Sequence, residues 1–398
     1  MACYHPLRAF DTGALTKNFK TKFRICGSET FAVQRDLKNS IYSKNTSFIT
    51  EWTPIPCGQC IGCRLDYSRT WADRCMLEAQ QYEHNAFITL TYDPEHLPPL
   101  KECLNTETGE IFNWPSLDYS HLKKFLDALR DYYEYHYNWK YEEHEVSPGE
   151  DYDRYDKKQD KFFKVDNPGI RYYACGEYGG KSGRPHFHIL VFNMPPLPDM
   201  KHWFTTDQHE KIYHSDILQN KIWKKGICSI GELTWNSAAY VARYVVKKQK
   251  GKTKGLIDLC GDLVLGLEKE DTRMSLKPGI AKKYYDENKH KFYETDEIVI
   301  AIRGKVRTIK PPRYFDKMYD LENEDPFIMR EIKEARAENA KKSMQDQLSR
   351  TTLSEQEYLA VKERNKLAQV ERLKRGLVEW WRYGWIYIFA QNTSLTQN

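Results

Sequence analysis

The spacing of apolar residues predicts an alternation of strands and helices along the first two thirds of the chain. Runs rich in β-branched and aromatic residues are typical of strands, and they are FITLT from Phe87, IRYYACGEY from Ile170, HFHILVF from His186 and GICSIGEL from Gly226. Apolar residues three or four positions apart predict helices over Leu65–Tyr82, Leu117–Tyr135, Asp207–Lys224 and Trp235–Lys248. This order of elements predicts an α+β fold, with a mainly antiparallel sheet backed by helices.

Changes in composition divide the chain into regions. Its 398 residues are enough for two or three domains. The stretch 141–168 is highly charged and ends at Pro168 and Gly169, which predicts an inserted loop outside the core. We expect a cysteine-rich region with a helix over 1–84, the α+β domain over 85–250, a basic accessory region over 251–325, and a helical region with an aromatic tail over 326–398.

The charge and the aromatic content permit a nucleic-acid partner without proving one. The net charge of +5 is only mildly basic. Many of the 27 Tyr, 17 Phe and 10 Trp lie among Lys and Arg, which suits stacking on unpaired bases, although a tyrosine-rich core is the alternative. The N-terminus lacks the apolar segment of a secretory signal, and the apolar stretch Leu377–Ala390 is too short to span a bilayer. We therefore expect no membrane partner and reduced cysteines.

Two histidines, His186 and His188, begin an otherwise apolar strand. Residues two apart on a strand share a face, so both imidazoles point the same way and resemble two ligands of one ion. A pair of surface histidines explains them equally well. Glu177 changes this balance, because a hairpin across the intervening GGKSGRP brings its carboxylate level with the histidines. The three side chains then favour a divalent-ion site with positions open to phosphate oxygens, over a simple pairing of Glu177 with Arg184.

A pair of tyrosines lies on the predicted helix that follows. Tyr240 and Tyr244 are four residues apart, so their rings lie on one face. An aromatic pair buried against the sheet is the alternative, but Arg243, Lys247 and Lys248 surround the pair, and a dry core excludes such neighbours. A phenol beside cations ionises more easily, and a phenolate can attack phosphorus.

A cluster of cysteines near the N-terminus predicts a structural zinc site. Cys57, Cys60 and Cys63 lie within seven residues, with glycines between them. A ferredoxin-type run would need another cysteine at Tyr67, so zinc is favoured over an iron–sulfur cluster, and free thiols are the alternative. We name Cys3 as the candidate fourth ligand, among the possible residues Cys3, His5, Cys26 and Cys75.

Four motifs, in this order, resemble a known family. They are PCGQCIGCRLDYSRTWADR, FITLTYD, YYACGEYGGKSGRPHFHILVF and SAAYVARYVVKK. Together they resemble the replication initiation proteins of small single-stranded DNA phages, within the gokushovirus branch of the Microviridae. The resemblance extends from about Cys3 to Tyr314 and includes RMSLKPGIAKKYYD and PPRYFD.

The resemblance implies an HUH endonuclease, named for two histidines that flank an apolar residue, as in His186-Phe187-His188. It implies that these histidines bind a catalytic Mg²⁺ or Mn²⁺ and that Glu177 is the third ligand. It also implies that Tyr240 and Tyr244 form a nucleophile pair. However, Tyr244 and Lys247 fit the Tyr-x-x-Lys pattern of single-tyrosine initiators, so whether one or both tyrosines react stays open.

The implied function is the initiation of rolling-circle replication. A tyrosine would nick the single-stranded viral origin, forming a 5′-phosphotyrosine and leaving a 3′-hydroxyl primer, and would later rejoin the strand. The expected partners are origin DNA, contacted by Arg184, Arg243 and Lys248, and a host helicase and DNA polymerase in the bacterial cytoplasm. The helicase must come from the host because Gly176–Ser182 misses the spacing of an ATPase phosphate-binding loop by one residue. The alternatives are a nuclease that uses activated water and a zinc-stabilised single-strand-binding protein without catalysis.

Overall fold

Two compact units make up the chain. The computed structural model describes residues 3–15, 21–34, 48–106, 108–150, 152–179, 183–207, 209–247, 257–259, 262–302, 305–323, 325 and 327–377. Residues 67–332 form a central unit, and residues 1–66 together with 333–398 form a terminal unit. Among the described helices, none is long and apolar enough to cross a membrane.

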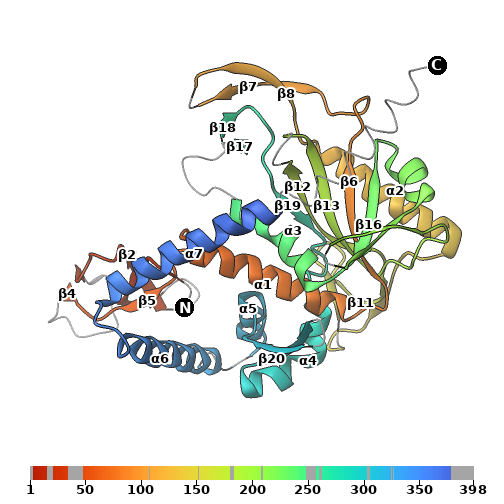
Figure 1. Cartoon of the computed structure of the whole chain (residues 1–398). Coiled ribbons are helices and arrows are strands. Elements are labelled where there is room, and N and C mark those ends of the chain that lie inside the picture. Colours follow the sequence, from red (N-terminus) through yellow and green to blue (C-terminus); the bar gives the residue numbers. More distant parts are fainter. Residues whose placement is uncertain are drawn as a thin grey trace, which may run out of the picture. The chain divides into compact units, whose positions relative to one another are not determined.

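The central unit is built on a seven-stranded sheet in which neighbouring strands are antiparallel (Figure 1). In spatial order the strands are β14 (Lys201–Thr205), β15 (Lys211–His214), β16 (Cys228–Glu232), β6 (Asn85–Thr91), β13 (Pro185–Phe192), β12 (Arg171–Tyr178) and β19 (Thr272–Met274). The predicted α+β class with an antiparallel sheet and helices is confirmed.

Both faces of β13 are covered, which explains its nearly continuous apolar sequence. All eight residues of this strand are buried. Phe187, Ile189 and Val191 belong to the core on the face covered by α2 (Tyr119–Tyr137). Leu190 and Phe192 belong to the core on the opposite face, together with residues of α1 (Ile61–Ala79), α3 (Trp235–Lys247) and α4 (Lys282–Thr295). Because side chains alternate along a strand, His186 and His188 lie on this second face.

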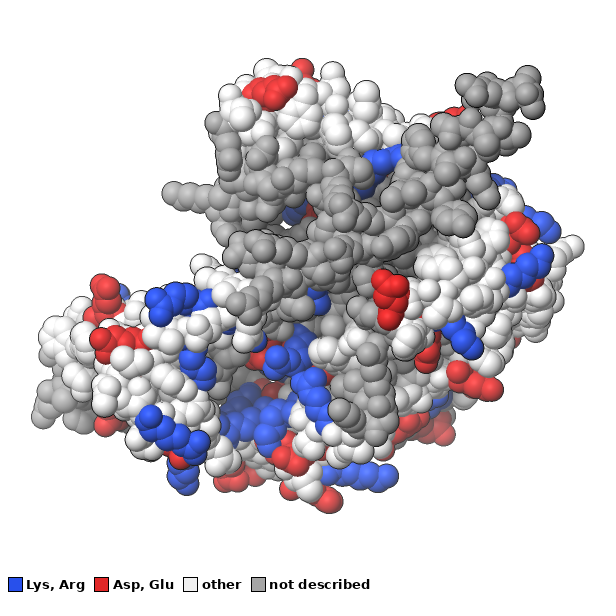
Figure 2. All heavy atoms as spheres, in the orientation of Figure 1, with Lys and Arg blue, Asp and Glu red and all other residues white. Residues whose placement is uncertain are grey.

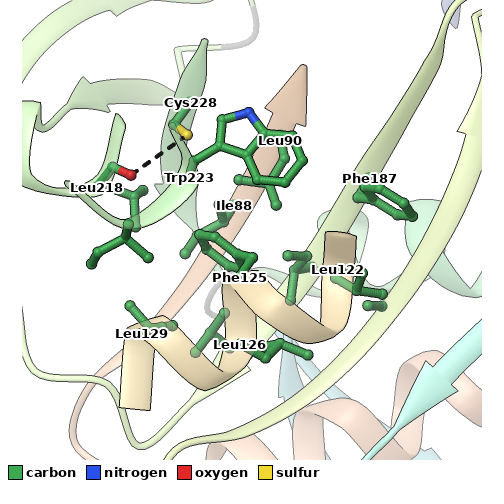
Figure 3. Close-up of a cluster of buried hydrophobic side chains, with 14 of the residues drawn as sticks. Ile88, Leu90, Leu122, Phe125, Leu126, Leu129, Phe187, Leu218, Trp223 and Cys228 are labelled. Atoms are coloured by element: carbon green, nitrogen blue, oxygen red, sulfur yellow. Dashed lines mark hydrogen bonds between the residues drawn. The ribbon is translucent and has the colours of Figure 1, made fainter. Parts of the chain in front are cut away.

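Helix α2 covers the first face with one apolar stripe. Its buried residues recur every three or four positions and are Leu122, Phe125, Leu126, Leu129 and Tyr133. Figure 3 shows this stripe facing Ile88 and Leu90 of β6. The helix begins after Asp118, whose side chain accepts a hydrogen bond from the Ser120 amide, and ends at Asn138, which has a left-handed backbone. The predicted helix over Leu117–Tyr135 is confirmed.

A buried ion pair joins α1 to the sheet on the opposite face. Glu78 of α1 and Arg171 of β12 are 1 % and 3 % exposed, and their side chains form an ion pair. The Glu78 carboxylate also accepts a hydrogen bond from the Ala281 amide, and Arg171 donates to the Pro278 carbonyl at 2.8 Å. The core on this face is completed by α5 (Arg313–Glu322) and by the hairpin of β20 (Ile298–Ile302) and β21 (Lys305–Ile309).

The charged stretch 141–168 folds as a sheet, so the predicted loop is wrong. It forms β9 (Tyr141–Val146), β10 (Arg154–Asp156) and β11 (Lys161–Pro168), in the order β10-β11-β9. Charges are paired between its strands, as in the bidentate contact of Arg154 with Glu143, and Tyr155 stacks on Phe162 at 4.8 Å. These cross-strand pairs let a polar sequence form strands. A further sheet has the order β17 (Ile257–Leu259), β18 (Asp262–Leu265), β7 (Leu100–Asn105) and β8 (Ile111–Pro115).

The helix predicted over Asp207–Lys224 is also wrong for most of its length. The segment contains β15, which pairs with β14 and β16, and then a short π-helical segment, η1 (Ile217–Trp223). Apolar residues of both elements reach the α2 side of the sheet, since Leu218, Ile222 and Trp223 belong to that core and Tyr213 packs against it. The spacing that suggested one helix therefore belongs to a strand followed by a short helical segment.

The terminal unit combines sequence-distant ends of the chain. Its strands β1 (Leu7–Leu15), β2 (Thr21–Cys26) and β5 (Thr53–Ile55) form one sheet, and β3 (Val33–Gln34) pairs with β4 (Phe48–Ile49). Its helices are α7 (Glu355–Leu377) and most of α6 (Ile328–Leu348). His5 Nε2 lies 2.6 Å from Glu363 Oε2 of α7, which connects the first residues to this helix. The aromatic stretch after Leu377 lies outside the described residues.

Candidate active site

The sheet brings three of the predicted ligands together beneath α3. The predicted hairpin is present: β12 pairs with β13, so that Glu177 lies opposite His186 and Cys175 lies opposite His188. Glu177 has the same alternation as Cys175, which belongs to the core on the α3 side of the sheet. The carboxylate and both imidazoles therefore project from the sheet toward α3.

Both imidazoles converge on one carboxylate oxygen. Nε2 of His186 and Nε2 of His188 lie 3.0 Å and 3.1 Å from Oε2 of Glu177. The three side chains offer one ligand atom each within 4.8 Å of one another. They are only 8 %, 5 % and 2 % exposed for Glu177, His186 and His188, so solvent does not separate them.

The other nitrogen of each ring is held by a neighbouring strand or loop. His186 Nδ1 lies 3.1 Å from the Arg184 carbonyl oxygen, and His188 Nδ1 lies 3.0 Å from the Thr89 hydroxyl of β6. A carbonyl accepts only, so Nδ1 of His186 carries the hydrogen, and a neutral ring then leaves a lone pair on Nε2. This lone pair faces the acceptor oxygen of Glu177, and a cation between them satisfies both.

The electrostatics of the three groups also suit a divalent cation. Burial alone would raise the pKa of Glu177, but its contacts with His186 and His188 outweigh burial and hold this pKa well below its usual range. Burial lowers the pKa of His188. The site thus contains an ionised carboxylate and a neutral imidazole, which are the forms that bind metals.

Tyr240 reaches the same carboxylate from α3. Its hydroxyl donates a hydrogen bond to Glu177 Oε2 at 3.0 Å, and its ring stands edge-on to His188 at 5.0 Å. The helix begins after Thr234, whose hydroxyl accepts from the Ser237 amide, and it packs on β12 and β13. On its sheet-facing side the buried residues are Ala238, Val241 and Ala242, which are small enough to bring the helix close to the strands.

Comparison with known proteins places the chain in a family. A family of replication-associated proteins named after ORF2 matches residues 139–249, which span β9 to α3. The "Replication-associated protein ORF2" of Spiroplasma virus 4 is 32% identical over 378 residues, covering 95% of this chain and 98% of that protein. The chain belongs to this family of phage replication-associated proteins. The family predicted from the sequence motifs is thereby confirmed.

Two other phage replication-associated proteins match about half of the chain. "Replication-associated protein VP4" of Bdellovibrio phage phiMH2K is 31% identical over 194 residues, or 49% of this chain and 48% of that protein. "Replication-associated protein ORF4" of Chlamydia phage 1 is 31% identical over 201 residues, or 49% of this chain and 38% of that protein. No solved structure matches the chain.

The remaining predicted residues of this replication-associated protein lie around the site or outside the described part. Arg184 immediately precedes β13, is half-buried, and donates to the Tyr92 carbonyl at 3.4 Å. Arg243 is half-buried on α3, one turn after Tyr240. The backbones of Tyr244 and Lys247 belong to α3, but their side chains lie outside the described residues, as does all of Lys248.

Thr89 is a site residue that the sequence analysis did not identify. It lies opposite His188 on β6, where Ile88 and Leu90 face the α2 core. A signal was present, because the threonine of FITLT alternates with these apolar residues and so shares the face of the histidines. Charge gives no comparable signal, since Figure 2 shows acidic and basic side chains mixed across one face, in keeping with the small net charge of +5.

A second cluster of potential ligands lies in the terminal unit. Cys57, Cys60, Cys63 and Cys3 offer four sulfur atoms within 4.8 Å of one another. The other possible fourth ligands lie elsewhere: His5 contacts Glu363, and Cys75 is buried in the core of the central unit. Cys26 belongs to β2 and is not a member of the cluster.

Proposed function

We propose that the protein initiates rolling-circle replication as an HUH-type endonuclease that nicks single-stranded viral origin DNA. The observation that carries this proposal is the shared oxygen of Glu177, which contacts His186, His188 and the Tyr240 hydroxyl within 3.1 Å. A potential metal site and a potential nucleophile thus meet at one atom. Membership in a family of phage replication-associated proteins supports the biological setting.

Glu177, His186 and His188 would hold Mg²⁺ or Mn²⁺. When bound, such an ion neutralises charge on the scissile phosphate and polarises it for attack. The protein's own contribution is to keep the ligands in place. The Arg184 carbonyl and the Thr89 hydroxyl orient the two rings, and the surrounding core limits access of bulk water to the carboxylate.

Tyr240 supplies the nucleophile in this proposal. Its hydroxyl loses its proton as the oxygen forms a bond to phosphorus, and the bond between phosphorus and the 3′ oxygen breaks. The 3′ oxygen takes up a proton and leaves as a 3′-hydroxyl, while the 5′ phosphate stays on the tyrosine. The hydrogen bond to Glu177 sets the position of the attacking oxygen before DNA arrives.

Tyr244 is the second nucleophile in the two-tyrosine form of the proposal. It lies one turn after Tyr240 on α3, so the same helix face can present both phenols in turn. In that form, Tyr244 cleaves the regenerated origin and the released 3′-hydroxyl rejoins the first strand. In the single-nucleophile form, Lys247 assists Tyr244. Arg184, Arg243 and Lys248 contact the DNA backbone, and a host polymerase and helicase extend and separate the strands.

The test is adduct formation on labelled circular single-stranded origin DNA with Mn²⁺ or Mg²⁺, analysed on a denaturing gel. We expect a covalent adduct in the wild type, some adduct in each single variant, Tyr240→Phe and Tyr244→Phe, and none in the double variant. Tyr213→Phe, a half-buried tyrosine of β15, is the matched control and should react normally. Nicking without any adduct would contradict the proposal and favour activated water.

The metal part of the proposal has its own test. A His186→Ala/His188→Ala variant should lose nicking but keep most of its affinity for single-stranded DNA, because backbone charge and stacking provide that affinity. Fluorescence anisotropy with an origin oligonucleotide measures the binding. Wild-type nicking by this variant in EDTA would refute the assignment of the three ligands.

A further inference from the structure

We propose that Cys3, Cys57, Cys60 and Cys63 bind a structural zinc ion that organises the terminal unit. This site is separate from the proposed nicking chemistry and belongs to a different unit of the chain. Its ligands come from three places: the segment before β1, the turn between β5 and α1, and the first turn of α1. One ion would therefore connect both chain segments that flank the β2-β1-β5 sheet.

The distances between sulfur atoms suit a single tetrahedral ion. Cys57 Sγ lies 3.9 Å from Cys63 Sγ, and Cys60 Sγ lies 4.0 Å from Cys3 Sγ. A disulfide would bring two sulfurs to about 2.05 Å. Zinc–sulfur bonds of about 2.3 Å in a tetrahedron separate the sulfurs by about 3.8 Å. An iron–sulfur cluster places several iron atoms between its cysteines and needs them farther apart than this group.

Backbone amides are directed at the sulfur atoms. Each of three sulfurs accepts at least one N–H bond of 3.3 to 3.5 Å, from the amides of Tyr4, Cys57, Gln59, Cys60 and Cys63. Such donors stabilise thiolates, which are the form that binds zinc. Gly58 makes the turn possible, because its φ of +73° is unfavourable for residues with a side chain.

The terminal unit also needs a stabilising link of this kind. Its sheet has three strands, and several large apolar side chains around it are exposed, namely Phe23, Ile25, Phe31, Phe48 and Trp52. A unit with so small a core usually depends on a metal or a disulfide. The described cysteines form no disulfide, and four of them are gathered at one point.

The first experiment is elemental analysis of the full-length protein purified without chelators. We expect about one zinc per chain in the wild type and in the His186→Ala/His188→Ala variant, because the site does not use the catalytic histidines. Cys57→Ser should lose most of this zinc, whereas Cys26→Ser, a cysteine of β2 outside the cluster, should keep it. Wild-type protein without zinc, or undiminished zinc in Cys57→Ser, would overturn the proposal.

A conservative variant covers the case in which Cys57→Ser does not fold. Cys57→His keeps a zinc ligand at this position, so we expect restored folding and zinc content. Replacing the zinc by Co²⁺ then reports the ligands, since each thiolate contributes to the sulfur-to-cobalt absorption. The wild type should show the tetrathiolate spectrum, and Cys57→His a weaker one. Identical cobalt spectra would exclude Cys57 as a ligand, and iron with the colour of a cluster would refute zinc.

Discussion

Glu78 neutralises two buried arginines, and its removal should strongly destabilise the central unit. Its carboxylate forms an ion pair with Arg171, which is 3 % exposed, and Arg74 lies one turn earlier on α1 and is 8 % exposed. Arg74 donates to the Ile280 carbonyl at 2.8 Å, so neither guanidinium can turn to solvent without losing its contacts. Glu78→Gln keeps the side-chain volume but removes the negative charge.

The expected cost is that of breaking a buried pair from one side, about 3 to 5 kcal/mol. For a unit of this size, such a loss lowers the melting temperature by about 10 °C. Urea unfolding followed by tryptophan fluorescence measures the change in the free energy of unfolding. Glu83→Gln is the matched control, because the Glu83 side chain is 87% exposed and should contribute little.

A double variant separates charge from packing. Glu78→Gln combined with Arg171→Met removes both partners, so it should be less destabilising than the sum of the two single changes. If Glu78→Gln alone costs less than about 1 kcal/mol, the two guanidiniums do not depend on this carboxylate, and the reasoning is wrong.

Three further changes test the structure around the site. Gly226→Ala should lower the free energy of unfolding by about 3 kcal/mol or more in urea titrations, since φ is +134° and the new methyl group would lie 2.3 Å from the Asp93 nitrogen. Thr89→Val removes the partner of His188 Nδ1 and should raise the Mn²⁺ concentration for half-maximal nicking about tenfold, with unchanged stability. Leu129→Ala empties a fully buried position and should cost about 2 to 5 kcal/mol, without changing the metal requirement of nicking. A wild-type result in any of these assays contradicts the corresponding contact.

Local patterns were sufficient to predict the hairpin that carries the proposed ligands. Alternation alone places His186 and His188 on one face, and a short connection between two strands restricts their register enough to bring Glu177 level with them. The apolar stripe of α2 was equally clear, because its period persists over five buried residues. Such features depend on residues close in sequence.

Features that depend on distant residues were not predictable in the same way. The hydrogen bond from Tyr240 to Glu177 joins residues 63 positions apart, and no sequence period indicates where α3 docks. The fourth cysteine illustrates the same limit, since Cys3 lies 54 residues before Cys57 and several other residues were equally possible. Composition misled in 141–168, where charges suggested a solvated loop but Arg154 and Glu143 pair between strands. Only the folded register reveals that pairing.

The division of the terminal unit between the two ends of the chain has a consequence for synthesis on the ribosome. Residues 67–332 are continuous, so this unit can complete its folding soon after it emerges. The residues made first must wait longest, because His5 finds its partner Glu363 only after α7 has been translated. A nascent chain therefore carries a finished central unit beside an unfinished N-terminal segment. A chain cut short before α6 would remain in that state, exposed to chaperones and proteases.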